Sequence, residues 1–553
     1  MKKLLKFTWL YLPIGWFLLG FVVLPMLTTV QSGFRIGDQS YSFANYRSFI
    51  FSNFGLSIIG NTLLLGIATV ILCGLIGTTL AIFINLVDFK GRKFYHSLLL
   101  IPFMLPGVLI VLSYIQLYGP SGILTSFLHN YLHWAIPRLR GMGGILVIHG
   151  FTQYIYFYTN ISVALKYLDY AQIEAAQSLG ASPGQIIKRI LLPEIAPALC
   201  ASTMMTFLSA ISSFSAPNLI AGGVKVLSTQ IMYSKTNNYL NIASMQVTLL
   251  VTLGVSILLL MSYYEKRWQF TNSVRAVAYN GWKIKNPFWG FCHRSVLNIF
   301  IFIILLPLLG TFYLSFIKSS SIMTDIFPTT FSWENYQAIL ENQRIYEPFL
   351  NSISMALLAV SAGLFITLPI AYFSVKLPNK FTHGIEFIAM LAMAIPVSSI
   401  AINLINGFNQ PNIFSWGQSL IGTFIILPIA YTIVAIPILL RLNITAVEKF
   451  NLDFINAAQS LGCQSITCIR KIIIPLLYPA IMQGSLLVFV RLVGEYNLSA
   501  FLYGVHNKPI SIAMVNAVQE YHIGLSMAYG ALTILISLVA ITIAEKISEK
   551  IHF

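Results

Sequence analysis

Long stretches of apolar residues recur along the whole chain, and they decide what it can fold into. Apolar residues make up 57% of the 553 positions and charged residues only 9%. So few charges cannot cover the surface of a water-soluble protein of this length. A bilayer core about 30 Å thick needs about 20 apolar residues per helix, and each helix satisfies its backbone hydrogen bonds internally. The sequence therefore predicts an all-α integral membrane protein.

The apolar stretches are long enough for about twelve membrane-spanning helices. The first follows a basic N-terminus, but its apolar run is long and lacks a small-residue cleavage site, so we expect an uncleaved span. The predicted spans cover residues 8–30, 57–86, 97–118, 143–165, 195–220, 243–263, 296–317, 350–375, 385–405, 419–440, 477–503 and 523–544.

Lysine and arginine residues of the short loops fall mainly on one side of these spans, and this asymmetry marks the cytoplasmic side. Both termini then lie in the cytoplasm, whereas Arg138 and Arg140 fall outside, against the trend. The net charge of +16 is spread over short loops and not gathered on one solvated face, which argues against a nucleic-acid partner. The basic residues on the cytoplasmic side are Lys2, Lys3, Lys6, Lys90, Arg92, Lys93, Lys166, Lys188, Arg189, Lys266, Arg267, Arg275, Arg441, Arg470, Lys471, Lys546 and Lys550.

The chain repeats itself at nearly constant separations. The first two repeats below are offset by 290 residues (332 minus 42) and the third by 282 (456 minus 174). The repeats are SFANY (42–46) with SWENY (332–336), Asn61-Thr62 with Asn351-Ser352, and EAAQSLGASPGQIIKRILLP (174–193) with NAAQSLGCQSITCIRKIIIP (456–475).

These repeats predict two halves of six spans in parallel orientation, at residues 1–264 and 296–553. Residues 265–295 form a basic, aromatic linker that we expect on the cytoplasmic side. A parallel repeat produces a pseudo-two-fold axis along the membrane normal, so we expect a transport pathway on that axis.

The longest repeated segment lies in a cytoplasmic loop of each half. In the first copy we expect a helix that ends at Gly180 in the left-handed conformation, then Ser182 as N-cap and Pro183 at the first position of a second helix. One face of this second helix is apolar, and because the segment occurs twice we expect that face to dock onto a two-fold partner. Its residues are Ile186, Ile187, Ile190 and Leu191, with Ile466, Ile469 and Ile473 in the later copy.

The repeated segment resembles the EAA loop of binding-protein-dependent ABC importer permeases, which seats a short coupling helix on the ATP-hydrolysing subunit. The resemblance implies two coupling sites, at 174–193 and 456–475. Asn456 replaces the glutamate of the family pattern, so the acidic contact belongs to one copy only. The positions that carry the resemblance are Glu174, Ala175, Ala176, Gly180, Leu192 and Pro193 in the first copy and Asn456, Ala457, Ala458, Gly462 and Pro475 in the second.

This resemblance implies a fold like that of type I ABC importer permeases, in a bacterial cytoplasmic (inner) membrane. It implies two copies of an ABC ATPase subunit as partners, together with a periplasmic or lipid-anchored substrate-binding protein. ATP would be used by the ATPase, and we expect no cofactor on this chain. A chain that fuses two permease halves is most similar to ferric iron importers, while thiamine, polyamine and other small organic-cation permeases remain alternatives.

No pattern typical of catalysis occurs in the sequence. We find no GxxxxGK[ST] phosphate loop, HExxH or GxSxG, and we assign no catalytic residue. The five cysteines are scattered and indicate neither a disulfide framework nor a metal site. An ion-coupled secondary transporter is a further alternative because His149, Arg491 and Glu495 fall within predicted spans. The paired cytoplasmic segments favour the ABC permease, since such a carrier has no ATPase to dock.

Two charged residues of the eleventh span stand out. Arg491 and Glu495 are spaced i, i+4, so on one continuous helix they would share a face and form an ion pair. Subtracting the 282-residue offset gives Ser209 and Ser213, so the first half has only hydroxyls there. We hypothesise that these four residues line the pathway and that Glu495 presents a carboxylate to a cationic substrate.

Overall fold

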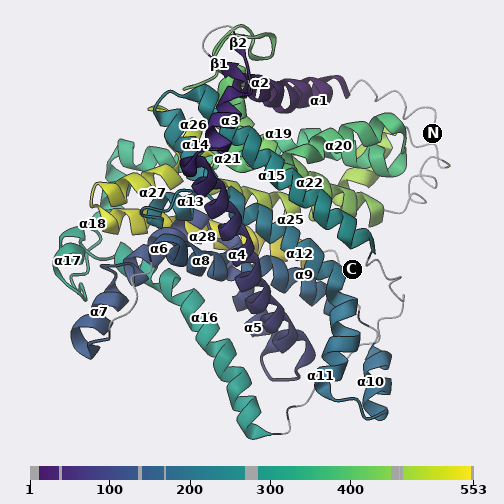
Figure 1. Ribbon diagram of the computed structural model, residues 1–553, viewed down its shortest axis with the longest axis vertical. Coiled ribbons are helices and arrows are strands. Elements are labelled where there is room, and N and C mark those ends of the chain that lie inside the picture. Colours follow the sequence, from purple (N-terminus) through teal and green to yellow (C-terminus); the bar gives the residue numbers. More distant parts are fainter. Residues whose placement is uncertain are drawn as a thin grey trace.

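The computed structural model describes residues 11–36, 40–134, 140–166, 168, 170–267, 284, 286–449, 460 and 465–549 (Figure 1). Within these residues the fold is helical apart from one short pair of strands, β1 (Arg35–Ile36) and β2 (Ser40–Tyr41), which run antiparallel. The predicted all-α class is confirmed. Residues 268–283 of the predicted linker, and Arg138 of the outer loop, lie outside the described residues.

The helices follow one another in the same general order in both halves. The first half contains α1 (Tyr11–Leu18), η2 (Leu19–Val23), α2 (Leu24–Gly33), α3 (Ala44–Ile50), α4 (Asn53–Leu86), α5 (Arg92–Leu100), η3 (Ile101–Met104), α6 (Gly107–Tyr118), α7 (Ile123–Leu132), α8 (Gly141–Thr152), α9 (Tyr154–Lys166), α10 (Tyr170–Ser178), α11 (Pro183–Ile186), η4 (Ile187–Leu191), α12 (Leu192–Ser212), α13 (Ser215–Ile220), α14 (Leu227–Thr236) and α15 (Leu240–Arg267). The second half contains α16 (Pro287–Ser315), α17 (Ser319–Thr324), α18 (Glu334–Glu341), α19 (Gln343–Lys376), α20 (Lys380–Ala394), α21 (Val397–Phe408), η5 (Ile413–Ser415), α22 (Ile426–Lys449), α24 (Ser465–Cys468), η6 (Ile469–Ile473), α25 (Ile474–Val493), α26 (Ser499–Leu502), α27 (Ile510–Gln519) and α28 (Ile523–Glu549).

Ten helical stretches in the described part of the chain are long and apolar enough to cross a membrane, or eleven if the bent pair α20 and α21 counts as one span. The predicted span 143–165 is present as two helices, α8 and α9, that meet at Gln153. The ten stretches are 11–33, 53–86, 107–132, 184–212, 240–261, 287–315, 343–376, 426–449, 470–493 and 523–547.

Each half breaks its third predicted span at a proline. Pro106 and Pro396 are 290 residues apart, the offset of the first two repeats. A proline ring disfavours the helical conformation of the residue before it. Leu105 (φ −106°, ψ 146°) and Ile395 (φ −92°, ψ 122°) are accordingly extended. α20 and α21 therefore meet at 111°, within the predicted span 385–405.

One face of α4 shows why the chain needs a lipid environment. Its exposed residues are apolar and recur every three or four positions, which places them in one stripe along the helix. A soluble protein would bury such a stripe, whereas hydrocarbon solvates it. The residues of the stripe are Leu64, Ile67, Ile71 and Leu75.

The repeated Asn-Thr and Asn-Ser pairs do the same work in both halves. In each half the asparagine amide donates to a backbone carbonyl of a later segment. The neighbouring hydroxyl accepts from the backbone N–H of the residue two positions after that carbonyl. Both sets of contacts tie the second span to the N-terminal side of a later helix, α14 or α27. The four hydrogen bonds are Asn61 Nδ2 to Lys225 O (3.1 Å), Asn351 Nδ2 to Lys508 O (3.2 Å), Leu227 N to Thr62 Oγ1 (2.9 Å) and Ile510 N to Ser352 Oγ (2.8 Å).

The SFANY and SWENY motifs also adopt matching structures. In each motif the asparagine side chain donates to the backbone before the motif, and the tyrosine ring packs on a preceding phenylalanine. These shared contacts show that the two halves are built on one plan. The contacts are Asn45 Nδ2 to Arg35 O (3.1 Å), Asn335 Nδ2 to Ser315 O (3.0 Å) and Ile317 O (2.9 Å), Phe34 with Tyr46 (4.7 Å between ring centroids) and Phe316 with Tyr336 (5.0 Å).

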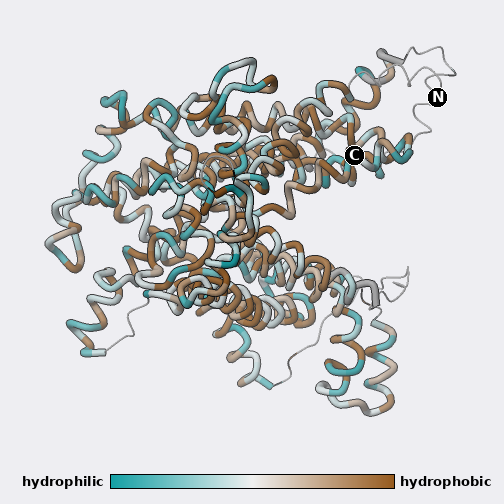
Figure 2. The backbone as a smooth tube through the Cα atoms, turned by 45° about the horizontal axis from the view of Figure 1, so that its top comes forward, coloured by the Kyte–Doolittle hydropathy of each residue, from teal (hydrophilic) through white to brown (hydrophobic). Residues whose placement is uncertain are grey.

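The first long helix of each half packs against the other half. α2 contacts α21 of the second half as well as α15 of its own, and α16 contacts α6 of the first half as well as α28. The largest core cluster accordingly combines residues of both halves. Figure 2 shows the body dividing into two arms, while α10 and α11 project from the end of one arm (Figure 1).

The lysine and arginine asymmetry predicts the orientation of the chain, and reporter fusions test it. Fusions at Gly91 and Ser182 should report the cytoplasm, and fusions at Asn237, Thr324 and His506 should report the outer side. Measuring alkaline phosphatase and fluorescent-protein activity at each position provides opposite signals for the two sides. A cytoplasmic signal at Asn237 and an outer signal at Ser182 would show that the orientation is reversed.

Candidate coupling segments and transport pathway

The first coupling segment contains the helix, turn and second helix that the sequence predicts. α10 ends in a turn at Gly180, which has φ +79°. Gly180 N donates to Gln177 O (2.9 Å) and Ala181 N donates to Ala176 O (2.9 Å). This pair of hydrogen bonds is a Schellman motif, and its left-handed residue favours glycine. The predicted conformation of Gly180 is confirmed.

The second helix begins with a reciprocal cap. Ser182 N donates to Gln185 Oε1 (2.8 Å), and Gln185 N donates to Ser182 Oγ (3.4 Å). This arrangement is a capping box, with Pro183 at the first helical position, where its missing N–H costs no hydrogen bond. The predicted N-cap is therefore confirmed, and the segment has a fixed local geometry.

The apolar face of the second helix does not point away from the protein. Ile186 is 2% exposed and Leu191 is 1% exposed, and both belong to a core cluster of the first half with Ile173 and Ile195. Ile187 and Ile190 are half-buried and pack against the same cluster. The prediction that this face is free for a partner is wrong, because the face is covered by the chain's own spans.

The exposed surface of the segment lies instead on α10 and the turn. Glu174, Ala175 and Gly180 are exposed, and Leu179 at the tip is 88% exposed. Ala176 and Pro193 are half-buried, as is Ser209 on α12, whereas Pro475 on α25 is exposed. The remaining second-copy positions of the motif, Asn456, Ala457, Ala458 and Gly462, lie outside the described residues.

Both copies contain a π-helical turn at the same place. η4 (Ile187–Leu191) and η6 (Ile469–Ile473) are 282 residues apart, and so are α11 and α24. In the first copy Leu192 N donates to Ile187 O, which closes the wide turn directly before Pro193. A wide turn tolerates proline there because the ordinary i to i−4 bond is already broken, and such turns occur frequently at functional sites.

The helix of the predicted span 477–503 ends early, which changes the relation of Arg491 to Glu495. α25 ends at Val493 and Gly494 is its C-cap (φ −100°, ψ 17°). The two charged residues therefore do not share a continuous helix face, and the ion pairs among the described residues are Lys318–Glu334 and His383–Glu386. The Arg491–Glu495 ion pair that the i, i+4 spacing allows is not formed. Arg491 is exposed, and Glu495 Oε1 accepts from Leu498 N (3.1 Å).

Ser213 occupies the position equivalent to Glu495, directly after α12 ends. Its hydroxyl lies 3.0 Å from His149 Nε2, and His149 Nδ1 lies 3.0 Å from Thr69 Oγ1. His149 is buried and thus serves as a hydrogen-bonding bridge between α4, α8 and the end of α12. This network holds the break in the span at Ser213.

The second half supports its break with a different residue at an equivalent position. Tyr431 is 282 residues after His149 and is also buried. Its hydroxyl lies 2.6 Å from Ser499 Oγ, which in turn donates to Glu495 O (2.6 Å). Sequence reasoning missed both Tyr431 and Ser499. The 282-residue offset applied to His149 would have pointed to Tyr431.

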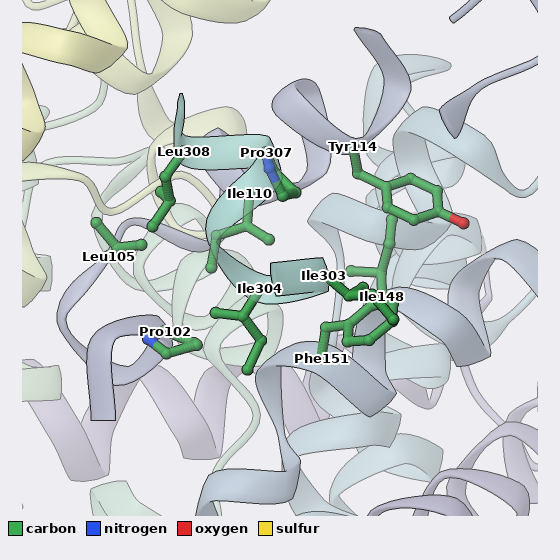
Figure 3. A pocket seen from close by; sticks show the side chains of 10 residues that line it. All are labelled: Pro102, Leu105, Ile110, Tyr114, Ile148, Phe151, Ile303, Ile304, Pro307 and Leu308. Carbon is green, nitrogen blue, oxygen red and sulfur yellow. The ribbon is translucent and has the colours of Figure 1, made fainter. Parts of the chain in front are cut away.

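A small cavity between α6, α8 and α16 is unsuited to a polar substrate. Its volume is about 20 Å³, which is room for about one water molecule. The side chains that line it are apolar apart from Tyr114, whose hydroxyl points away from the other labelled side chains (Figure 3). The lining residues are Pro102, Leu105, Ile110, Tyr114, Ile148, Phe151, Ile303, Ile304, Pro307 and Leu308.

Comparison with known families adds a match in each half. The model of the family described as binding-protein-dependent transport system inner membrane component matches residues 75–269 and again residues 363–552. The two matched ranges fall on the two structural halves described above, and together they cover most of the chain.

Two relatives match over almost the whole chain, and a third matches over less than half of it. The probable ABC transporter permease protein y4fN of Sinorhizobium fredii is 30% identical, over 98% of this chain and 96% of its own length. The ferric transport system permease protein FbpB of Actinobacillus pleuropneumoniae is 23% identical, over 94% of this chain and 75% of its own length. A putative 2-aminoethylphosphonate transport system permease protein, PhnU of Salmonella typhimurium, is 27% identical over 40% of this chain and 81% of its own length.

Proposed function

The chain belongs to the family of binding-protein-dependent transport system inner membrane components, the permeases of ABC importers, and we propose that its substrate is ferric iron. As a permease it is a multi-pass protein of the inner membrane and not an enzyme, and ATP is hydrolysed by a separate subunit. A substrate-binding protein is its other partner.

The observation that supports iron is the extent of the similarity. The relative whose name includes ferric transport matches across both fused halves, whereas the 2-aminoethylphosphonate permease matches less than half of this chain. Fe³⁺ is a hard cation that prefers oxygen ligands. Glu495 and Ser213, at the two helix breaks, offer a carboxylate and a hydroxyl. Thiamine, polyamines and other small organic cations would suit the same carboxylate.

One observation favours a second candidate substrate. Arg491 is exposed and forms no ion pair in the described part of the chain. A guanidinium group binds phosphate-like oxygens through two parallel hydrogen bonds. A phosphonate that also carries an amine could therefore contact Arg491 and Glu495 together. We therefore take 2-aminoethylphosphonate as the second candidate substrate. The name of one relative of this chain, the permease PhnU, includes that compound.

We assign ATPase coupling to the exposed surface of α10 and its turn, at residues 174–180, and to the equivalent segment of the second half. Two such segments suit two copies of an ATPase. Support comes from Leu179, whose side chain is 88% exposed at the tip of a projecting helix, and from the fixed turn that follows it. Glu174 supplies an acidic contact in the first half, whereas Asn456 replaces it in the second, so the two contacts differ in charge.

The substrate can be tested with the assembled transporter. The permease is reconstituted in liposomes with its ATPase and mixed separately with binding proteins loaded with Fe³⁺, thiamine or 2-aminoethylphosphonate. We expect the Fe³⁺-loaded protein to stimulate ATP hydrolysis severalfold and the others to have no effect. The unloaded binding proteins are the control. Stimulation by another loaded protein, with none by the Fe³⁺-loaded one, would overturn the iron assignment.

The coupling turn can be tested at Gly180. A valine there would be forced into the left-handed region, at a cost of about 1–3 kcal/mol, and would redirect α11. We expect Gly180→Val to remain in the membrane and to lose most binding-protein-stimulated ATP hydrolysis. Gly184→Val is the matched control, because an added Cβ at Gly184 meets no atom within 4 Å and no positive φ is recorded there. Normal hydrolysis by Gly180→Val would contradict the coupling role.

The carboxylate of Glu495 can be tested without disturbing its backbone contact. Glu495→Gln keeps an oxygen that accepts from Leu498 N but loses the charge. We expect normal membrane abundance and Fe³⁺ uptake reduced by about tenfold or more, since contacts to charged groups contribute about 1.5–3 kcal/mol.

The double variant Arg491→Gln, Glu495→Gln is the control for a structural ion pair. It should transport as poorly as the single variant. Low abundance of Glu495→Gln that recovers in the double variant would mean that Glu495 is needed only to balance Arg491.

A further inference from the structure

Two residues that are equivalent by the repeat stack on each other at the interface of the halves. Tyr496 is 282 residues after Phe214, the offset of the coupling segments. The two rings lie 5.9 Å apart between centroids, with an interplanar angle of 23°. The next pair along the chain also meets, because Ser215 N donates to Asn497 Oδ1 (3.1 Å).

These contacts locate the pseudo-two-fold axis. In a two-fold arrangement, a residue of one half can contact its own equivalent only where both lie close to the axis. Phe214 with Tyr496 and Ser215 with Asn497 are two consecutive pairs of this kind. The axis of the transporter therefore passes between the chain breaks that follow α12 and α25, where a parallel repeat places its pathway.

The stacked rings close the axis at this level. Phe214 is 0% exposed and Tyr496 is 6% exposed. Phe501 of the second half packs on Phe214 with 5.0 Å between ring centroids. Asn218 Nδ2 donates to the Tyr496 hydroxyl (3.1 Å), which adds a hydrogen bond between the halves. A hydrated ion has no route between these side chains in the structure.

The segments that carry the rings are held by side-chain hydrogen bonds from outside the long helices that precede them. Each follows the end of a long helix and accepts a hydrogen bond from a serine hydroxyl of the second helix after it. Ser228 on α14 donates to Ser213 O (2.7 Å), and Ser511 on α27 donates to Glu495 O (2.8 Å). Side chains thus hold the carbonyl oxygens of Ser213 and Glu495, so we expect that the rings can separate without unwinding α12 or α25.

We propose that Phe214 and Tyr496, together with Ser215 and Asn497, form the constriction that closes the pathway and parts in each transport cycle. The proposal rests on the importer function and not on the identity of the substrate. It makes these four residues positioning residues of the pathway, with the phenol of Tyr496 and the amide of Asn497 as the polar groups nearest to a passing substrate.

Paired cysteines test whether the rings must part. Phe214→Cys and Tyr496→Cys are combined in a full-length chain whose five native cysteines are replaced by alanine, and the pair is joined by a short bifunctional thiol reagent or by oxidation. We expect the joined pair to abolish binding-protein-stimulated ATP hydrolysis in the reconstituted complex. Reduction of the oxidised pair should restore it, which shows that the protein remained folded.

The matched control is a cysteine pair within one half. Phe316 and Tyr336 have ring centroids 5.0 Å apart, and both belong to the second half. Joining cysteines at these positions should leave ATP hydrolysis unchanged. Full activity of the joined 214–496 pair, with the single-cysteine variants also active, would overturn the proposed constriction.

A second measurement requires no transported substrate. A small water-soluble thiol reagent labels Phe214→Cys, in the same cysteine-free chain, either without nucleotide or with the ATPase trapped by ATP and vanadate. We expect labelling rates in the two states to differ by about tenfold or more, because a side chain leaves or enters a closed contact. Equal rates would overturn the proposal. A complex that no binding protein stimulates would count against the proposed function alone, and the labelling rates would still decide the constriction.

Discussion

Hydrocarbon offers no partner for backbone N–H and C=O groups, and this constraint shapes the whole molecule. It makes long helices the default and allows an irregular backbone only where protein groups replace the missing hydrogen bonds. The breaks after α12 and α25 follow this rule. His149 and Ser228 contact Ser213 in the first half, and Ser499 and Ser511 donate to Glu495 O in the second. At both breaks, polar side chains therefore contact groups at the points where the chain departs from a helix.

The two halves share their backbone plan and differ in side chains near the axis. The hydrogen bonds of Asn61 and Asn351 are the same, and so is the proline that breaks the third span. By contrast, His149 is matched by Tyr431 and Ser213 by Glu495. A shared plan would suit the two-fold movement proposed for an importer, while the unlike side chains would give the proposed pathway different polar groups on its two sides. A substrate without two-fold symmetry is better recognised by such an asymmetric site.

Much of this arrangement could be predicted from the sequence because it depends on local rules. Apolar length located the spans, the 290 and 282 offsets revealed the two halves, and Gly180 with Ser182 revealed the coupling turn. The errors concern properties that depend on tertiary packing. The sequence shows that Ile186 and Leu191 form an apolar face, but it does not show whether a partner protein or the chain itself covers that face. The fold shows that the chain itself covers it. Similarly, the i, i+4 spacing of Arg491 and Glu495 implied a pair only if the helix continued past Gly494.

The helices also explain how an event at the ATPase can reach the axis. The stretch Gly184–Ser212 is one continuous helical path of 29 residues, about 43 Å long at 1.5 Å per residue. It begins beside the turn at Gly180 and ends two residues before Phe214. In the second half, Arg470–Val493 ends three residues before Tyr496. If the proposed coupling role holds, a displacement of either coupling segment would be transmitted along this helix to the stacked rings. The π-helical turn near the start of each path, at Ile187–Leu191 and Ile469–Ile473, is the place where such a helix can bend, so the proposed coupling segment could move with an ATPase while the span stays packed in the bilayer.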